Sequence, residues 1–195
     1  MSDESLVAFR SPEVIQAATS RLLIVDVQEK LLPAMPDSAR LLAGCRLLLG
    51  AAGVFQVPIC VTEQYPQGLG ATVGELAALC PPAVIKQEFS SWPSLKWPAA
   101  GEDASGRFQV VIAGLETHVC VLQTAFDLQS AGYRVFIVAD AVASRRDSDR
   151  DRALERMQTT GITIVTAESV VFEWCERSDR PEFKALAKLV KDRPL

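Results

Sequence analysis

The stretch Val110-Val-Ile-Ala-Gly-Leu-Glu-Thr-His-Val-Cys-Val-Leu-Gln-Thr-Ala-Phe-Asp-Leu128 decides the predicted fold. It opens with an unbroken apolar run, Val110 to Ala113, which is typical of a strand buried on both faces of a parallel sheet. Gly114 ends the run, and a short polar turn follows. Apolar residues then recur at the spacing of one helix face, at Val121, Leu122, Ala125 and Leu128. The stretch therefore predicts a strand, a turn and a helix.

Cys120 falls at or near the first turn of this helix, just past the carboxyl end of the strand. Helix N-termini carry partial positive charge and unpaired N–H groups. A thiol in such a place is biased toward the thiolate, which makes Cys120 a candidate nucleophile. A lone cysteine at a helix start is more often a packed side chain than a nucleophile. Other residues of the chain are needed to distinguish these two roles.

The rest of the chain alternates in the same way. We expect six strands, at 21–26, 57–62, 83–86, 110–113, 133–139 and 161–165. Besides the helix after Cys120, we expect helices at 11–20, 37–52, 72–79, 147–159, 168–176 and 181–191. This alternation predicts a three-layer α/β sandwich with a central six-stranded parallel sheet and right-handed crossovers. No repeat or linker interrupts it, so residues 1–195 are expected to form one domain.

Composition narrows the class of protein. A chain of 195 residues with 49% hydrophobic content suits a single packed core. No apolar run reaches the roughly 18 residues that span a membrane. The acidic start, residues 1–5, lacks the features of a signal peptide. A net charge of -4 gives no reason to expect a nucleic-acid partner. The arginines between 145 and 152 alternate with aspartates, which is typical of a solvated helix start.

The five cysteines are widely spaced, odd in number and without a CxxC motif. This pattern argues against a disulfide framework and fits a reducing cytoplasm, where we expect the protein to be located. Cys45 and Cys60 lie in apolar segments and are expected to be small buried hydrophobes. The single histidine, His118, gives little support for a zinc site. We therefore expect no metal and no cofactor.

Three chemically potent residues follow three different predicted strands: Asp26 the first, Lys86 the third and Cys120 the fourth. Ligands of open parallel sheets bind beyond the carboxyl ends of the strands. Each residue alone has an ordinary explanation, as a cap, a solvated lysine or a packed thiol. Together they indicate a cysteine-based active site, although parallel α/β folds place many polar residues at this edge.

These residues and their neighbours resemble the isochorismatase-like cysteine hydrolases. The resemblance lies in Leu22-Leu-Ile-Val-Asp-Val-Gln28, the Lys86 strand end and Gly114-Leu-Glu-Thr-His-Val-Cys-Val121, in that order along nearly the whole chain. Val61-Thr-Glu-Gln-Tyr-Pro-Gln-Gly-Leu-Gly-Ala-Thr72 and Pro181-Glu-Phe-Lys184 are similar to the isochorismatase-domain-containing subgroup. The resemblance implies the Rossmann-like fold of that superfamily.

The resemblance also implies roles. Cys120 would attack an electrophilic carbonyl as the covalent nucleophile. Asp26 would take the thiol proton, pass it to the leaving amine and later activate water. Lys86 would hold Asp26 ionised and favour the thiolate.

An oxyanion hole belongs to the same set of implied features. The family typically has a cis peptide shortly before its nucleophile, which would fall here between Leu115 and Glu116. That bond would aim the N–H of Glu116, together with that of Cys120, at the developing negative charge on oxygen.

Two departures limit what carries over. Between Asp26 and Lys86 the chain has no histidine, so the metal motif of nicotinamidases is missing and a metal-dependent nicotinamidase is disfavoured. Isochorismatase itself lacks the cysteine that this chain keeps. Hydrolysis of a small amide or related acyl substrate therefore fits better than cleavage of isochorismate.

The rim of the expected pocket is formed by residues near the strand ends: Gln28, Tyr65, Phe89, Trp92 and His118. An aromatic lining would favour a flat or apolar acyl group, but each aromatic could equally serve the core or a subunit contact. His118 could bind substrate, cap a helix or lie at an interface. Relatives are often homo-oligomers, so we expect a dimer or higher by analogy.

Two other readings compete with a hydrolase. One is a binding or scaffold protein of the same fold without turnover, against which the intact Asp26, Lys86 and Cys120 argue. The other is an aspartate-phosphorylating enzyme, because Asp26 follows an apolar strand. Such enzymes need a second aspartate two residues after the first, and this chain has Gln28 at that position.

Overall fold

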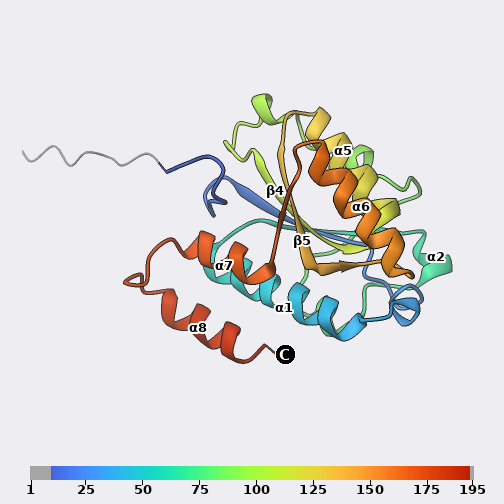
Figure 1. Ribbon diagram of the computed structural model, residues 1–195, viewed down its shortest axis with the longest axis horizontal. Coiled ribbons are helices and arrows are strands. Elements are labelled where there is room, and N and C mark those ends of the chain that lie inside the picture. Colours follow the sequence, from blue (N-terminus) through green and yellow to red (C-terminus); the bar gives the residue numbers. More distant parts are fainter. Residues whose placement is uncertain (1–9, 194–195) are drawn as a thin grey trace, which may run out of the picture.

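The computed structural model describes residues 10–193 and has a six-stranded sheet at its centre (Figure 1). Neighbouring strands are parallel throughout, in the order β3-β2-β1-β4-β5-β6. The strands are β1 (Ser20–Val25), β2 (Ile59–Gln64), β3 (Val84–Lys86), β4 (Gln109–Leu115), β5 (Arg134–Ala143) and β6 (Thr163–Val165). The expected parallel α/β sheet is confirmed.

Helices cover both faces of the sheet. Helices α1 (Ser38–Phe55), α7 (Ala167–Cys175) and α8 (Phe183–Lys191) lie on one face, and α5 (Leu122–Ser130) and α6 (Asp147–Thr159) lie on the other (Figure 1). Each face has its own apolar core, one centred on α1 and α7 and one on α5 and α6. The three-layer arrangement is therefore as expected.

Short helical turns connect the main elements. They are η1 (Leu32–Ala34), α2 (Pro66–Leu69), α3 (Gly74–Ala77), α4 (Trp92–Leu95), η2 (Ala100–Glu102) and the π-helical turn η3 (Thr117–Val121). The structure forms the α2 turn where the sequence predicted a loop, with Pro66 at its first position. Most other elements begin and end within about two residues of their expected bounds.

Strands β1 and β4 form the centre of the sheet, where the strand order changes direction. Gly114 pairs with Val25 in their register and has a φ of +123°. A Cβ atom at Gly114 would lie 2.0 Å from the carbonyl oxygen of Val25. Glycine is therefore required for β4 to approach β1, and both strands deliver their last residues to the same point of the sheet edge.

Helix α1 begins at an Asp37 cap, whose side chain accepts a hydrogen bond from the N–H of Arg40 at 3.2 Å. It does not stop at Gly53 as expected, because Gln56 adopts the left-handed conformation and ends it three residues later. The helix has 18 residues with a mean hydropathy of 1.4, so by length and composition it could cross a membrane. Arg40 and Arg46 interrupt its apolar residues, so the helix contains no unbroken apolar run of that length. Its apolar residues pack in the core against β5 and α7, which accounts for its hydropathy.

Strand β5 runs past Asp140, where the sequence predicted its end, to Ala143. Its register with β4 shifts between Ile112 and Gly114. At this irregularity Asp140 accepts a hydrogen bond from the N–H of Ala167, and Arg150 donates to the carbonyl of Ala139 at 2.6 Å. The Arg150 side chain is only 19% exposed, so this arginine is not part of a solvated helix start.

The helix predicted for residues 11–20 is not formed. Residues 10–19 make isolated turns instead, and the buried side chain of Gln109 fixes them. Its Oε1 accepts from the N–H of Gln16 at 2.8 Å, and its Nε2 donates to the carbonyls of Pro12 and Val14. These tertiary bonds replace the helical hydrogen bonds. The N-terminal residues 1–5, which were predicted to lack the features of a signal peptide, lie outside the described residues.

Candidate active site

Asp26 and Lys86 form a buried ion pair at the carboxyl edge of the sheet. Asp26 directly follows β1, and Lys86 ends the edge strand β3. Lys86 Nζ lies 2.7 Å from Asp26 Oδ2, and both side chains are fully buried. The backbone of Asp26 has a φ of +51°, an uncommon conformation for a residue other than glycine. Such strain is found most often at functional sites, where surrounding structure enforces it.

The ammonium of Lys86 is surrounded by acceptors. Besides its ion pair with Asp26, it donates to Gln64 Oε1 at 2.8 Å and to the carbonyls of Phe89 at 3.1 Å and Glu88 at 3.2 Å. The Gln64 amide is held in this orientation because its Nε2 donates to the carbonyl of Gln87 at 2.6 Å. A buried ammonium needs such partners to stay charged. This arrangement therefore stabilises a permanent positive charge beside Asp26.

Cys120 lies in the same cluster. It belongs to the π-helical turn η3, which joins β4 to α5, and 7% of its surface is exposed. Its Sγ lies 4.0 Å from Gln64 Oε1. Turns of this kind occur frequently at functional sites. The three residues predicted from the strand ends, Asp26, Lys86 and Cys120, are thus brought together.

The charge state of Cys120 differs from the expected one. Burial raises the pKa of the thiol to about 12, and the negative charge of Asp26 adds to the effect, while Lys86 opposes it. The resting residue is therefore a neutral thiol, which corrects the expectation that its position at the helix start favours the thiolate. Desolvation outweighs the helix dipole here. A nucleophilic Cys120 needs a base to take its proton.

Asp26 is placed to be that base. Its Oδ1 accepts a hydrogen bond from the hydroxyl of Thr62 at 2.7 Å. Its Oδ2 has no aligned hydrogen-bond donor within residues 10–193, although Lys86 Nζ is close to it. A carboxylate oxygen with a free acceptor site next to a neutral thiol can take up the thiol proton.

The expected cis peptide between Leu115 and Glu116 is not formed, and no peptide bond from residue 10 to 193 is cis. Glu116 is extended, with a φ of -85° and a ψ of 142°. Its carbonyl accepts from the N–H groups of Val119 and Val121, which starts the turn under Cys120. Its side chain accepts from Arg145 Nε at 2.9 Å. The reason for aiming the Glu116 N–H at a substrate oxygen is thereby lost.

Gln28, expected at the pocket rim, is fully buried and bonded within the protein. Its Nε2 donates to the carbonyls of Gln64 and Gly70, and its Oε1 accepts from the N–H of Gln64 at 2.8 Å. No polar atom of the side chain is left for a ligand. Gln28 instead fixes the end of β2, including Gln64, against the segment after β1.

Tyr65 and Phe89 lie beside the cluster with exposed rings. The N–H of Tyr65 donates to the carbonyl of Lys86, and the carbonyl of Phe89 accepts from the Lys86 ammonium. Tyr65 is 49% exposed and Phe89 is 55% exposed. Their backbones thus belong to the structure around Lys86, and their side chains are free to contact a ligand or another protein.

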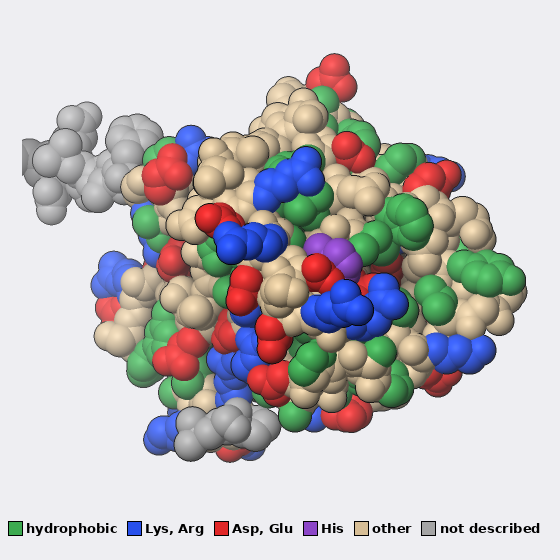
Figure 2. All heavy atoms as spheres, turned by 45° about the vertical axis from the view of Figure 1, so that its right-hand side comes forward, with side chains coloured by type: hydrophobic (Ala, Val, Ile, Leu, Met, Phe, Trp, Pro, Cys, Tyr) green, Lys and Arg blue, Asp and Glu red, His purple; other side chains and the backbone are tan. Residues whose placement is uncertain are grey.

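The other two rim residues point elsewhere. Trp92 packs on the core beneath α5, with its ring edge-on to Tyr133 at a centroid distance of 6.1 Å. His118 Nδ1 lies 2.9 Å from Ser144 Oγ, and Nε2 lies 3.9 Å from Asp149 Oδ2. Figure 2 shows the histidine at the surface among acidic and basic side chains. These contacts hold both side chains against neighbouring elements, and the place of Trp92 and His118 at a pocket rim stays a prediction.

Thr62 and Gln64 are the site residues that sequence reasoning missed. The structure extends β2 to Gln64, which pairs with Lys86 in the sheet register. Had the strand been predicted to end there, the rule that placed Asp26 and Lys86 would have included Gln64. Thr62 had no comparable signal, because a threonine inside a strand is ordinary.

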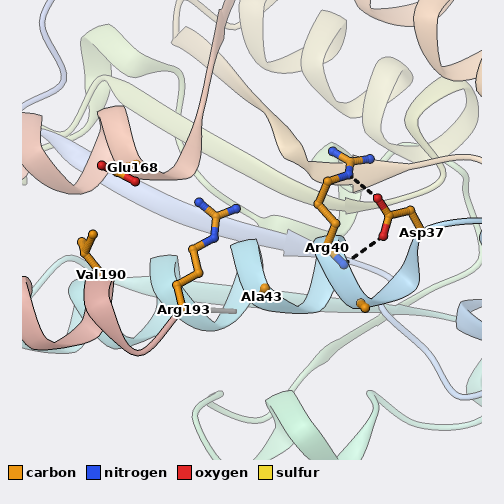
Figure 3. A pocket seen from close by; sticks show the side chains of 7 residues that line it. Asp37, Arg40, Ala43, Glu168, Val190 and Arg193 are labelled. Carbon is orange, nitrogen blue, oxygen red and sulfur yellow. Dashed lines mark hydrogen bonds and ion pairs between the residues drawn. The ribbon is translucent and has the colours of Figure 1, made fainter. Parts of the chain in front are cut away.

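We found no grouping of three His, Cys, Asp or Glu side chains suited to a metal ion in residues 10–193. A separate hollow of about 410 Å³ lies between α1, the start of α7 and the end of the chain (Figure 3). Arg40 and Arg193 line it, and each is paired with an aspartate, Asp37 and Asp140 respectively. None of the residues around Cys120 lines this hollow.

Comparison with known proteins gives consistent matches. Residues 20–169 match the family described as Isochorismatase domain. Isochorismatase domain-containing protein 1 of Danio rerio is 38% identical over 91% of this chain, which spans 62% of that protein's length. A solved structure of MAR1 ribonuclease from Caenorhabditis elegans has a TM-score of 0.83 and 34% identity, with 93% of this chain and 94% of that one covered.

A second solved structure is that of the YcaC gene product of Escherichia coli, described as an octameric hydrolase of unknown specificity. It has a TM-score of 0.83 and 26% identity, and the match covers 95% of this chain and 93% of that one. The sequence motifs, the fold and these matches agree. This chain belongs to the isochorismatase-domain family.

Proposed function

We propose that this protein is a metal-independent cysteine hydrolase that cleaves a small amide or related acyl substrate. The family supports a hydrolase. The observation that carries the finer proposal is the single cluster of a neutral Cys120 thiol, an Asp26 carboxylate with a free acceptor site and the Lys86 ammonium. Nucleophile, base and cation are the parts that acyl transfer through a covalent intermediate requires.

The reaction would proceed in two halves. Asp26 takes the S–H proton as Cys120 attacks the substrate carbonyl, and the same proton then passes to the departing amine, leaving a thioester. In the second half Asp26 takes a proton from water, which attacks the thioester and releases the acid and the free thiol. Lys86 keeps a positive charge beside the carboxylate throughout. The N–H of Cys120 is proposed to stabilise the oxyanion.

Alkylation by iodoacetamide at neutral pH tests the nucleophile. We expect Cys120 to react faster than Cys80, although Cys80 is the more accessible of the two. Access therefore cannot explain a faster Cys120. If mass mapping shows Cys120 to be no more reactive than Cys80, the nucleophile assignment fails.

A substrate panel tests the reaction class. Hydrolysis of any small amide or ester should be lost in Cys120→Ala and kept in the control Cys80→Ala. Retained turnover in Cys120→Ala would overturn the mechanism. No hydrolysis of any member, together with tight retention of a ligand, would favour the scaffold alternative. RNA belongs in the panel because the Caenorhabditis elegans neighbour is described as a ribonuclease. A net charge of -4 provides no electrostatic attraction for it.

The chain is also proposed to form homo-oligomers. The Escherichia coli neighbour is described as octameric. In this chain Ile85, Tyr65 and Phe89 are large apolar side chains that are exposed close to the edge strand β3. Light scattering should show a species larger than a monomer, and Ile85→Lys should reduce its mass. The exposed Leu79, replaced by Lys, is the control.

A further inference from the structure

The two oxygens of Asp26 have different surroundings. Oδ1 accepts the hydroxyl hydrogen of Thr62, at an O–O distance of 2.7 Å. Oδ2 lies 2.7 Å from Lys86 Nζ but accepts no aligned hydrogen bond in the described part of the chain. The first oxygen is therefore occupied by a directed donor, and the second keeps an acceptor site open.

The hydrogen bond between Thr62 and Asp26 has only one possible direction, and this fixes the donor of the next contact. Thr62 has one hydroxyl hydrogen, and an ionised carboxylate can only accept. The hydrogen of Thr62 therefore points to Asp26, so the Ser91 hydroxyl, 3.4 Å from Thr62 Oγ1, is the donor of their contact. The N–H of Ser91 in turn donates to Thr124 Oγ1 at 2.8 Å.

This chain of groups connects three parts of the fold. Thr62 lies on β2, Ser91 directly precedes α4, and Thr124 lies on α5, the helix that follows Cys120. All three residues are fully buried. Because water does not compete with buried hydrogen bonds, these bonds connect the base to the helix that follows the nucleophile.

We propose that Thr62 is a positioning residue for the reaction: it fixes Asp26 through Oδ1 and leaves Oδ2 as the atom that accepts the Cys120 proton. The inference rests on the proposed function. Thr62 does not touch the thiol and acts only through Asp26. A hydrogen bond donated to the charged form of an acid favours that form. Without the hydroxyl, Oδ1 loses its directed donor, and the carboxylate becomes a less effective base for the thiol proton.

The test is the rate of Cys120 alkylation by iodoacetamide as a function of pH, measured on the full chain by mass mapping. In the wild type we expect the rate to fall on the acidic side, because attack by Cys120 needs a base that can still take its proton. In Thr62→Val this acidic limb should move to higher pH by about one unit. Thr62→Ser, which keeps the hydroxyl, should restore the wild-type profile.

Thr117 provides a matched control. It is also a fully buried threonine, it lies in the same turn as Cys120, and its hydroxyl has no hydrogen-bond partner in residues 10–193. Thr117→Val should therefore leave the acidic limb in place. A purely structural role for Thr62 would lower the rate equally at every pH, with no movement of the limb.

The outcomes separate the two proposals. If wild-type Cys120 is not preferentially labelled, or shows no acidic limb, the proposed function fails. If the limb exists and Thr62→Val leaves it unmoved, the role of Thr62 is overturned and the proposed function stands. If Thr62→Val does not fold, Ser91→Ala is the alternative variant, because it removes only the hydroxyl that donates to Thr62. It should move the limb in the same direction by a smaller amount, and an unmoved limb would again overturn the inference.

Discussion

The amide oxygen of Gln64 accepts a hydrogen bond from Lys86 Nζ at 2.8 Å and lies 4.0 Å from Cys120 Sγ. Since the Gln64 nitrogen is bonded to the carbonyl of Gln87, the oxygen cannot turn away. A neutral amide oxygen thus lies close to both the cation and the thiol. Replacing it by a charge should change the reactivity of the thiol without changing the shape of the site.

Gln64→Glu is expected to slow alkylation of Cys120 at neutral pH by about tenfold or more. The new carboxylate would lie next to the thiol and raise the Cys120 pKa further, so the thiolate becomes rarer. Mass mapping after timed iodoacetamide treatment measures the effect. The control is Gln123→Glu, which adds the same charge at an exposed position of α5. Equal rates in the two variants would contradict the prediction.

Lys86→Met should lower the free energy of unfolding by about 3–5 kcal/mol, because it leaves the Asp26 carboxylate buried without its cation. Asp26→Asn should have a comparable effect for the opposite charge. The double variant should lose less than the sum of the two, because no unpaired charge then remains. Urea unfolding followed by tryptophan fluorescence measures all three. Additive losses would show that the pair is not coupled. Arg152→Met, which breaks an exposed pair, should change little.

Gly114→Ala should destabilise the fold by more than about 3 kcal/mol, since the added methyl group would meet the carbonyl of Val25 and the backbone conformation disfavours alanine. Gly53→Ala is the matched control. Its Cβ would have no atom within 4 Å, and it lies inside α1. That variant should gain up to about 1 kcal/mol from helix propensity. Thermal unfolding of the two variants should therefore shift in opposite directions, and a tolerated Gly114→Ala would refute the close approach of β4 to β1.

Stability should fall at alkaline pH through Cys45. Burial raises the pKa of this thiol from 9.0 to about 12. The folded state therefore keeps a proton that the unfolded state releases, and the resulting stability is complete below pH 9 and is lost as pH rises toward 12. In Cys45→Ala the free energy of unfolding should fall less steeply across this range, by about 1.4 kcal/mol per pH unit.

The control for Cys45 is Val61→Ala, which also removes buried apolar volume but no ionising group. It should lower stability at every pH and leave the slope unchanged. Urea unfolding at a series of pH values from neutral to alkaline gives both curves. Parallel curves for wild type and Cys45→Ala would disprove the assignment.

The sequence was sufficient for the sheet and for the cluster of Asp26, Lys86 and Cys120 because both depend on repeating geometry. Apolar runs alternate with helical periodicity, and the carboxyl ends of parallel strands meet at one edge. Asp26 and Lys86 directly follow or end such a run, and Cys120 lies in the turn after another, so their meeting point could be predicted without knowing any side-chain conformation. The order of the strands in the sheet was not predicted, because the pattern of apolar runs does not determine it.

The features that the sequence did not predict depend on the direction of side chains and on hydrogen bonds between residues far apart in the chain. Gln28 and Gln64 are the same residue type in sequence. In the structure the Gln28 amide is hydrogen-bonded to backbone groups, whereas Gln64 Oε1 lies next to the Cys120 thiol. The position of Cys120 at a helix start was predicted to favour the thiolate, whereas burial raises the thiol pKa and favours the neutral form. Position at a helix start gives no information about desolvation. The segment before β1 was predicted as a helix from its capping residues, whereas Gln109, about ninety positions away, determines its path.

Strand β3 has three residues and a single neighbour in the sheet, β2, and the catalytic lysine proposed here is its last residue. Such an edge can open locally without the core, which holds β1 and β4, coming apart. Amide hydrogens of Ile85 and Lys86 should exchange with deuterium long before those of Ile112 and Ala113. If the proposed function holds, heating should abolish hydrolysis by releasing the Lys86 cation while most of the native structure persists, so the temperature limit of activity will be set by the weakest strand of the sheet.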